Sequence, residues 1–258
     1  MIEESTIRSL HVEAMRRGDL HEGHDDHALF QASTVSALLD GAYEGDLTFA
    51  ELAAEGDTGI GTLNALDGEM IALDGHFYRA DSHGHISEID PLERTPFAVV
   101  TRFDADRQIE LDGPLDLAGL EEILTGDKNE APVAVYRVEG HFSSVKCRSV
   151  PRQEPPYRPL VEVVETQNVF EFRSVEGHLI GFRFPVWAEG VEIGGYHFHF
   201  IDRDLNRGGH VLDVSLDSGS AAIQHADDLH VELPPGLELG SPDLAAETHE
   251  AISRAEHG

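Results

Sequence analysis

The sequence is poor in the features that define several common protein classes. It has one cysteine, Cys147, in 258 residues, which excludes an intrachain disulfide and a cysteine-based zinc module. We expect this cysteine to be a small buried side chain. No apolar run approaches the length of a membrane helix, and the N-terminal residues contain no apolar signal segment. These features predict a cytoplasmic protein without membrane contact.

Basic residues are also scarce. The chain has 18 Lys and Arg against 49 Asp and Glu, a formal net charge of −31. Such a surface repels nucleic acid and anionic membranes, so neither is an expected partner. The acids are spread along the whole chain, and concentrated salt would screen their mutual repulsion. We interpret the composition as adaptation to high salt, with ordinary acidity for solubility as the alternative.

Histidine is abundant by contrast, and three of the 16 histidines fall in residues 195–213, GYHFHFIDRDLNRGGHVLD. Successive side chains of a strand point to opposite faces, so His197 and His199 share one face and the aromatic residues between them share the other. The polar, Gly-rich segment that follows predicts a turn, which places His210 on the second strand of a hairpin. Three neutral imidazoles with an open position are typical of a catalytic zinc site.

Two other groups of histidines lack this context. His83 and His85 lie in a Gly/Ser loop without a third ligand nearby. The group at 21–27 lies in a charged segment without apolar periodicity, so nothing there would hold metal ligands in place. The sequence therefore favours one metal site, at 197, 199 and 210.

Short strands separated by turns, with a few helices between them, predict an α+β fold. We expect a strand-rich, two-part architecture: a flexible segment 1–26, an α+β part 27–128, and a C-terminal part 129–258 with the metal hairpin and a terminal helix that begins at Ser241. The helices are expected at 33–39, after the capping box at Thr48, at 115–124 and at 161–167. Strands are expected at 95–103, 131–138, 142–150, 169–172 and 178–184, with turns at Glu139-Gly140 and Glu176-Gly177.

A series of short motifs in a fixed order resembles the alpha-acetolactate decarboxylase family, from about Phe30 to the C-terminus. The motifs are Ser33–Leu39, Tyr43–Thr48, Gly59–Thr62, Leu66–Met70, Thr95–Ala98, Arg148–Pro151, Pro156–Leu160 and Gly195–Phe200. A generic fold does not require so many motifs in that order, so the resemblance is specific.

The resemblance implies an enzyme that decarboxylates acetolactate to acetoin with a divalent metal, usually zinc, and no organic cofactor. It implies that His197, His199 and His210 hold the metal. The functional positions that it implies elsewhere are Glu69, Arg148, Thr62 and a C-terminal glutamate, for which Glu256 is the match and Glu250 the alternative.

The chemistry is consistent with these residue types. Loss of carbon dioxide leaves an enediolate, which a metal chelated by the ketone and hydroxyl oxygens would stabilise. Arg148 suits the substrate carboxylate, and Glu69 or Glu256 could protonate the enediolate.

Two other functions stay open on the sequence. A cupin-like dioxygenase also uses a His-x-His pair, but it would have a glutamate where this chain has only Asp202 and Asp204. A non-enzymatic metal-binding protein would explain the histidines and the acidity. Without the resemblance, Glu69 is one solvated acid among 49 and Thr62 an ordinary strand residue. The number of subunits also stays open on the sequence, with a homodimer as one alternative.

Overall fold

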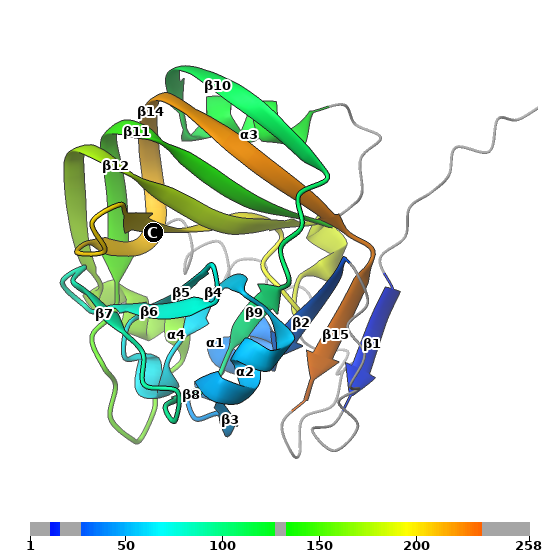
Figure 1. The fold of residues 1–258 in the computed structure, drawn as a ribbon. Helices are drawn as coiled ribbons and strands as arrows, with labels where there is room; N and C mark the ends of the chain where they lie inside the picture. The colour runs from blue at the N-terminus through cyan, green and yellow to red at the C-terminus, as the bar shows by residue number, and fades with distance from the viewer. Residues whose placement is uncertain (1–10, 16–26, 127–132, 234–258) are drawn as a thin grey trace, which may run out of the picture.

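The protein is built from two β-sheets that pack against each other, as the computed structural model shows (Figure 1). The structure describes residues 11–15, 27–126 and 133–233. The first sheet has eight strands in the order β1-β15-β2-β9-β4-β5-β6-β7. Its strands are β1 (His11–Met15), β2 (Ala28–Ala32), β4 (Thr58–Thr62), β5 (Glu69–Leu73), β6 (His76–Ala80), β7 (Ile86–Glu88), β9 (Ala98–Thr101) and β15 (Asp228–Glu232).

The centre of this sheet is a set of short antiparallel pairs. β4 and β5 are joined through the turn at Asp67-Gly68, and β5 and β6 through the turn at Asp74-Gly75, as their Asp-Gly pairs predict. β15 pairs in parallel with both β1 and β2. A small additional sheet pairs β3 (Leu47–Thr48) with β8 (Arg94–Thr95).

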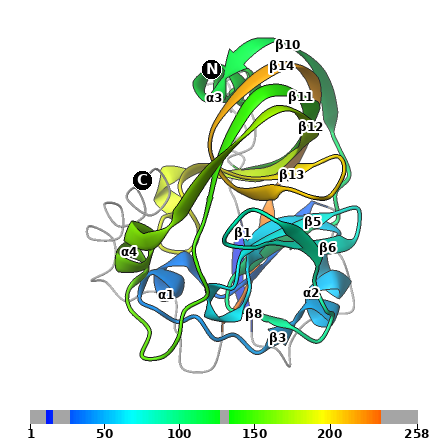
Figure 2. The ribbon, with the colours of Figure 1, turned by 90° about the vertical axis from the view of Figure 1, so that its left-hand side faces the viewer.

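The second sheet is long and strongly curved (Figure 2). Its order is β10-β14-β11-β12-β13, and β13 also pairs with β14, so four of its strands form a ring. The strands are β10 (Arg107–Asp116), β11 (Val133–Ser149), β12 (Asn168–Phe184), β13 (Gly195–Asp202) and β14 (Gly208–Ala226).

Few helices accompany the sheets. α1 (Val35–Leu39) begins at Thr34, whose hydroxyl accepts from the Ala37 amide, and α2 (Phe49–Glu55) has the predicted capping box between Thr48 and Glu51. The others are α3 (Leu117–Thr125), α4 (Leu160–Val163), and the short 3-10 turns η2 (Asn64–Leu66), η3 (Val164–Thr166) and η4 (Val186–Ala188). No helix in the described ranges is long and apolar enough to cross a membrane.

The apolar core follows these layers. One cluster fills the interior of the curved sheet beneath α3, and it includes Phe142, Phe198 and Phe200. A second lies between the two sheets, where Ile60 and Ile71 of the first meet Phe182 of the second. A third cluster joins α1, α4 and the loops beside them. Residues of the third cluster line the candidate site.

The predicted turns at Glu139-Gly140 and Glu176-Gly177 are wrong, because β11 and β12 run through them without interruption. Gly140 pairs with Gly177 on one side and with Gly219 on the other. A Cβ on Gly140 would lie 2.6 Å from Leu216 Cδ1, and one on Gly177 would lie 2.5 Å from the Ile201 carbonyl oxygen. These glycines permit close packing in a bent sheet rather than chain reversal.

The strand-rich fold with few helices agrees with the predicted class. The two sheets do not divide at residue 128, because β10 belongs to the second sheet and β15 returns to the first. Residues 11–15, inside the segment for which flexibility is predicted, form β1. The helix predicted from Ser241 lies outside the described residues.

Candidate functional site

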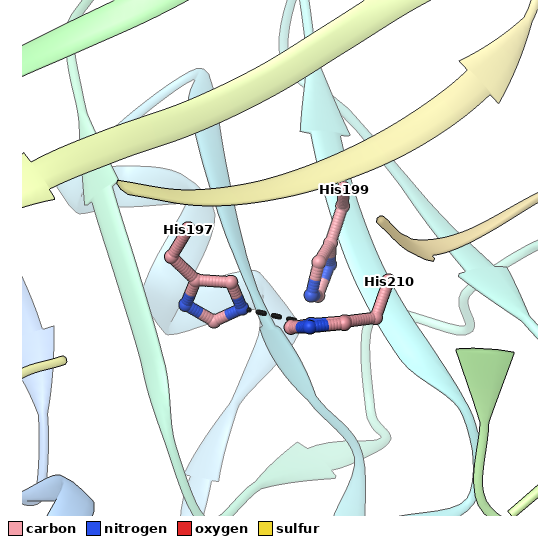
Figure 3. A group of neighbouring side chains, drawn as sticks. All are labelled: His197, His199 and His210. Carbon is pink, nitrogen blue, oxygen red and sulfur yellow. Dashed lines mark hydrogen bonds between the residues drawn. The ribbon is translucent and has the colours of Figure 1, made fainter. Parts of the chain in front are cut away.

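The three predicted histidines meet on the hairpin of β13 and β14. His199 lies directly opposite His210 in the antiparallel register, and His197 lies two residues earlier on the same face of β13. Their rings converge on one point (Figure 3). One ligand nitrogen from each lies within 4.8 Å of the others, and all three residues are at least nine-tenths buried. The predicted alternation is confirmed, because Phe198 and Phe200 enter the core on the opposite face.

His199 is held as a metal ligand requires. Its Nδ1 lies 2.8 Å from the carbonyl oxygen of Met70, and because a carbonyl can only accept, this nitrogen carries the hydrogen. In the neutral ring, Nε2 then presents its lone pair toward the other histidines. Burial, reinforced by the nearby His197, holds the pKa of His199 well below its ordinary value of 6.5. The ring is therefore neutral at physiological pH.

The spacing of the other two rings also suits an ion. His197 Nε2 and His210 Nδ1 lie 3.1 Å apart. Two nitrogens bound to one tetrahedral zinc, each at about 2.1 Å, are separated by roughly 3.4 Å, so a small adjustment accommodates the ion. Within the described ranges, this is the one group of three or more metal-ligating side chains close enough to share an ion.

Arg148 and Glu69 reach the same cavity from two different strands. Arg148, on β11, pairs in register with His210. Glu69 begins β5, and its Oε2 lies 3.7 Å from His199 Nε2. Both are buried, with exposed fractions of 5% for Arg148 and 8% for Glu69. The first sheet therefore contributes a carboxyl group, and the second contributes a guanidinium and the histidines.

Thr62 lines the cavity as well, but its hydroxyl is engaged in the chain itself. It donates to the carbonyl oxygen of Gly68 at 2.8 Å, across the turn that leads into Glu69. Thr62 and Glu69 are also cross-strand neighbours. The hydroxyl thus fastens the turn from which the acid projects.

The rest of the cavity wall is apolar and was not identified from the sequence. It is formed by α1, α4 and the loops between the sheets, with Val35, Leu38, Leu66, Phe97, Val150, Leu160 and Ile193. In the sequence these side chains resemble any other core residues. The Met70 carbonyl was missed for a similar reason, since no side-chain pattern reports which backbone oxygen faces a given ring.

Several other predicted residues lie elsewhere. Asp202 accepts hydrogen bonds from the amides of Asn206 and Arg207 and from the Arg207 side chain, so it stabilises the hairpin turn rather than the histidine site. The acid that a cupin-like site would need is therefore engaged elsewhere. Cys147 is buried as predicted, and its burial, with the nearby Glu69, raises the pKa of the thiol well above 9.0.

The remaining predictions fall on the surface or outside the described ranges. His83 and His85 are exposed loop residues. Glu256 and its alternative Glu250 lie outside the described residues.

Sequence comparison identifies one family. The profile of the family described as alpha-acetolactate decarboxylase matches residues 29–245. A protein of that name from Methylococcus capsulatus is 43% identical over 260 residues, which cover 97% of this chain and 99% of the relative. Another from Methanosarcina mazei is 42% identical over 229 residues, which cover 88% of this chain and 80% of the relative.

Solved structures give the same result. The alpha-acetolactate decarboxylase of Bacillus subtilis strain 168 superposes with a TM-score of 0.83 at 37% identity, covering 90% of this chain and all of that one. A Staphylococcus aureus protein, described as of unknown function and similar to alpha-acetolactate decarboxylase, superposes with a TM-score of 0.82 at 31% identity. That match covers 89% of this chain and 100% of the other.

Proposed function

This chain belongs to the alpha-acetolactate decarboxylase family and converts acetolactate to acetoin, and we propose that the cavity around His197, His199 and His210 is where the reaction occurs. The observation that carries the proposal is the burial of Glu69 and Arg148 beside three converging imidazoles. In the parts that the structure describes, four acidic residues are buried, and Glu69 is the one that lines this cavity.

Zinc is the metal that we propose for the three histidines. The support is the convergence of three imidazole rings, the hydrogen bond that orients His199, and the position of the cavity beside the rings. When bound, the ion would act as a Lewis acid that draws electron density from the substrate ketone.

Arg148 is proposed to bind and orient the substrate carboxylate. Its guanidinium is a permanent cation with planar donors that match a carboxylate. If it holds the scissile bond perpendicular to the plane of the ketone, the bond between the hydroxyl-bearing carbon and the carboxyl carbon can break efficiently. Carbon dioxide leaves, and the electron pair flows toward the ketone oxygen to give the enediolate.

Glu69 is proposed to deliver a proton to the carbon that has lost carbon dioxide, which completes acetoin. It lies beside His199 and lines the cavity. The apolar wall suits the two methyl groups of the substrate and limits the entry of water, so protonation would occur on one face. Thr62 is proposed to hold the turn before Glu69. Glu256, with Glu250 as the alternative, is proposed as a second acid.

The test is an acetoin assay on racemic acetolactate, combined with zinc analysis of the purified protein. His197→Ala should remove tight zinc binding and activity together. His83→Ala, in an exposed loop, serves as the matched control and should change neither. A His197→Ala protein with full zinc content and normal turnover would refute the assignment.

We also propose that the acidity serves folding in concentrated salt. With a net charge of −31 and few buried acids in the described ranges, most of the repulsion lies at the surface, where counter-ions can screen it.

A further inference from the structure

Asp67 connects the two segments that carry the proposed chemistry. Its Oδ2 accepts a hydrogen bond from Arg152 Nη1 at 2.9 Å and another from Arg79 Nη1 at 3.3 Å. Asp67 stands two residues before Glu69, and Arg152 stands four residues after Arg148. One carboxylate oxygen thus ties the turn before Glu69 to the loop after Arg148.

The turn around Asp67 has a conformation that needs such support. Ala65 and Leu66 have φ values of 61° and 53°, in the left-handed region that non-glycine residues rarely adopt. The Ala65 amide donates to the Tyr43 carbonyl at 2.8 Å, and the Gln153 amide donates to the Ala65 carbonyl at 2.7 Å. The Arg152-Gln153 dipeptide therefore docks on this turn through both a side chain and its backbone.

We propose that Asp67 is a positioning residue, which keeps the carboxyl of Glu69 and the guanidinium of Arg148 at the separation that the substrate requires. Glu69 and Arg148 belong to different sheets, so no strand pairing between β5 and β11 fixes their distance. The link from Asp67 to Arg152 joins their two segments next to the cavity. This inference rests on the roles proposed above for Glu69 and Arg148.

The link should affect rate more than stability. The exposed side-chain fractions are 30% for Asp67, 31% for Arg79 and 60% for Arg152, and partly exposed ion pairs contribute little to the free energy of unfolding. A small displacement of catalytic groups, by contrast, is costly: about 1 Å can reduce the rate by about a hundredfold. Replacement of a purely structural residue would instead lower the free energy of unfolding more than the rate.

Asp74 provides a matched control. It is the Asp of the Asp-Gly turn at the other end of β5, and it also pairs with an arginine, Arg137, at 2.8 Å. It does not line the cavity. Asp67→Asn and Asp74→Asn therefore remove the same charge from equivalent turns, one beside the site and one remote from it.

The experiment measures kcat, KM, zinc content and thermal midpoint for both variants of the zinc-loaded enzyme. Asp67→Asn should lower kcat by about tenfold to a hundredfold while zinc content stays full and the midpoint matches that of Asp74→Asn. Arg152→Gln should lower kcat similarly, and the double variant should be no slower than the slower single variant, because both changes break one link.

Several outcomes would overturn the proposal. The first is an Asp67→Asn variant with the same kcat as Asp74→Asn. The second is a double variant in which the two reductions in kcat multiply. The third is loss of zinc from Asp67→Asn. If Asp67→Asn does not fold, Arg152→Gln decides alone, and parental turnover would refute the link. Glu69→Gln and Arg148→Ala are measured in parallel. If those two retain the parental rate, the proposed function fails; if they are inactive while Asp67→Asn is normal, only the positioning role fails.

Discussion

Replacement of Glu69 by glutamine tests the proposed proton delivery most directly. The side chain is 8% exposed, and its Oε2 lies 3.7 Å from His199 Nε2. Glutamine keeps the shape of the side chain but has no titrating proton. The three histidines are unchanged, so the variant should bind zinc as the parent does.

The expected loss follows from the role of the group. A positioned general acid contributes about 10²- to 10⁴-fold in rate, so the barrier should rise by about 3 to 5 kcal/mol. Folding should change little, because a neutral amide in this cavity avoids the desolvation of a carboxylate. The variant should therefore be folded, loaded with zinc and slow.

The product distinguishes this role from others that would also slow the enzyme. If water replaces Glu69 as the proton source, either face of the enediolate can be protonated, and the acetoin should lose enantiomeric purity. The assay combines turnover, zinc content and chiral chromatography, with Glu88→Gln as the control, since Glu88 is 73% exposed. Parental turnover, or slow turnover with unchanged enantiomeric purity, would mean that another group delivers the proton.

Four further predictions concern the substrate, the surface, pH and packing. Arg148→Ala should keep zinc but lose turnover by orders of magnitude, because it removes the cation for the carboxylate; parental turnover would contradict this role. The thermal midpoint should rise strongly from low to molar salt, and a flat response would reject salt adaptation. The metal-free protein should lose stability as pH falls below about 6.5, because the unfolded chain then protonates His199 and the folded chain, with its depressed pKa, does not. Denaturant titrations should show a shallower pH dependence for His199→Gln. Gly181→Ala should destabilise folding by about 1 to 3 kcal/mol and weaken zinc retention, since its Cβ would lie 2.2 Å from Phe198 Cδ1. Gly119→Ala on α3, where a Cβ would lie 3.1 Å from the Asp116 side chain, should cost less.

The histidine triad could be predicted from the sequence because all three residues lie on one hairpin. The two-residue period of a strand places His197 and His199 on one face, and a polar turn returns the chain to His210. Both rules are local, so they need no knowledge of the rest of the fold. The capping box at Thr48 and the two Asp-Gly turns around β5 were predictable for the same reason.

Glycine gave the wrong local signal in the long strands. Gly140 and Gly177 each follow a glutamate, as a turn residue often does, yet they lie in the middle of β11 and β12. Their environment is set by neighbouring strands distant in sequence, where a Cβ would contact Leu216 or the Ile201 carbonyl. A turn glycine and a close-packed glycine look alike in a single sequence, because the difference lies in contacts across strands.

Glu69 and Arg148 were identified through the family motifs rather than through any periodicity, and the fold explains why. They come from different sheets, and nothing in the spacing of residues 69 and 148 reports that β5 lies beside the hairpin. The hydrogen bond from His199 to the Met70 carbonyl makes that junction explicit. It orients a proposed metal ligand and, in the same contact, fixes the strand residue next to Glu69. The three proposed metal ligands thus come from one hairpin, whereas catalysis would depend on how the two sheets meet. Variants that disturb the junction but leave this hydrogen bond intact, such as Asp67→Asn, should therefore separate turnover from zinc content, which variants of His197 or His210 cannot do.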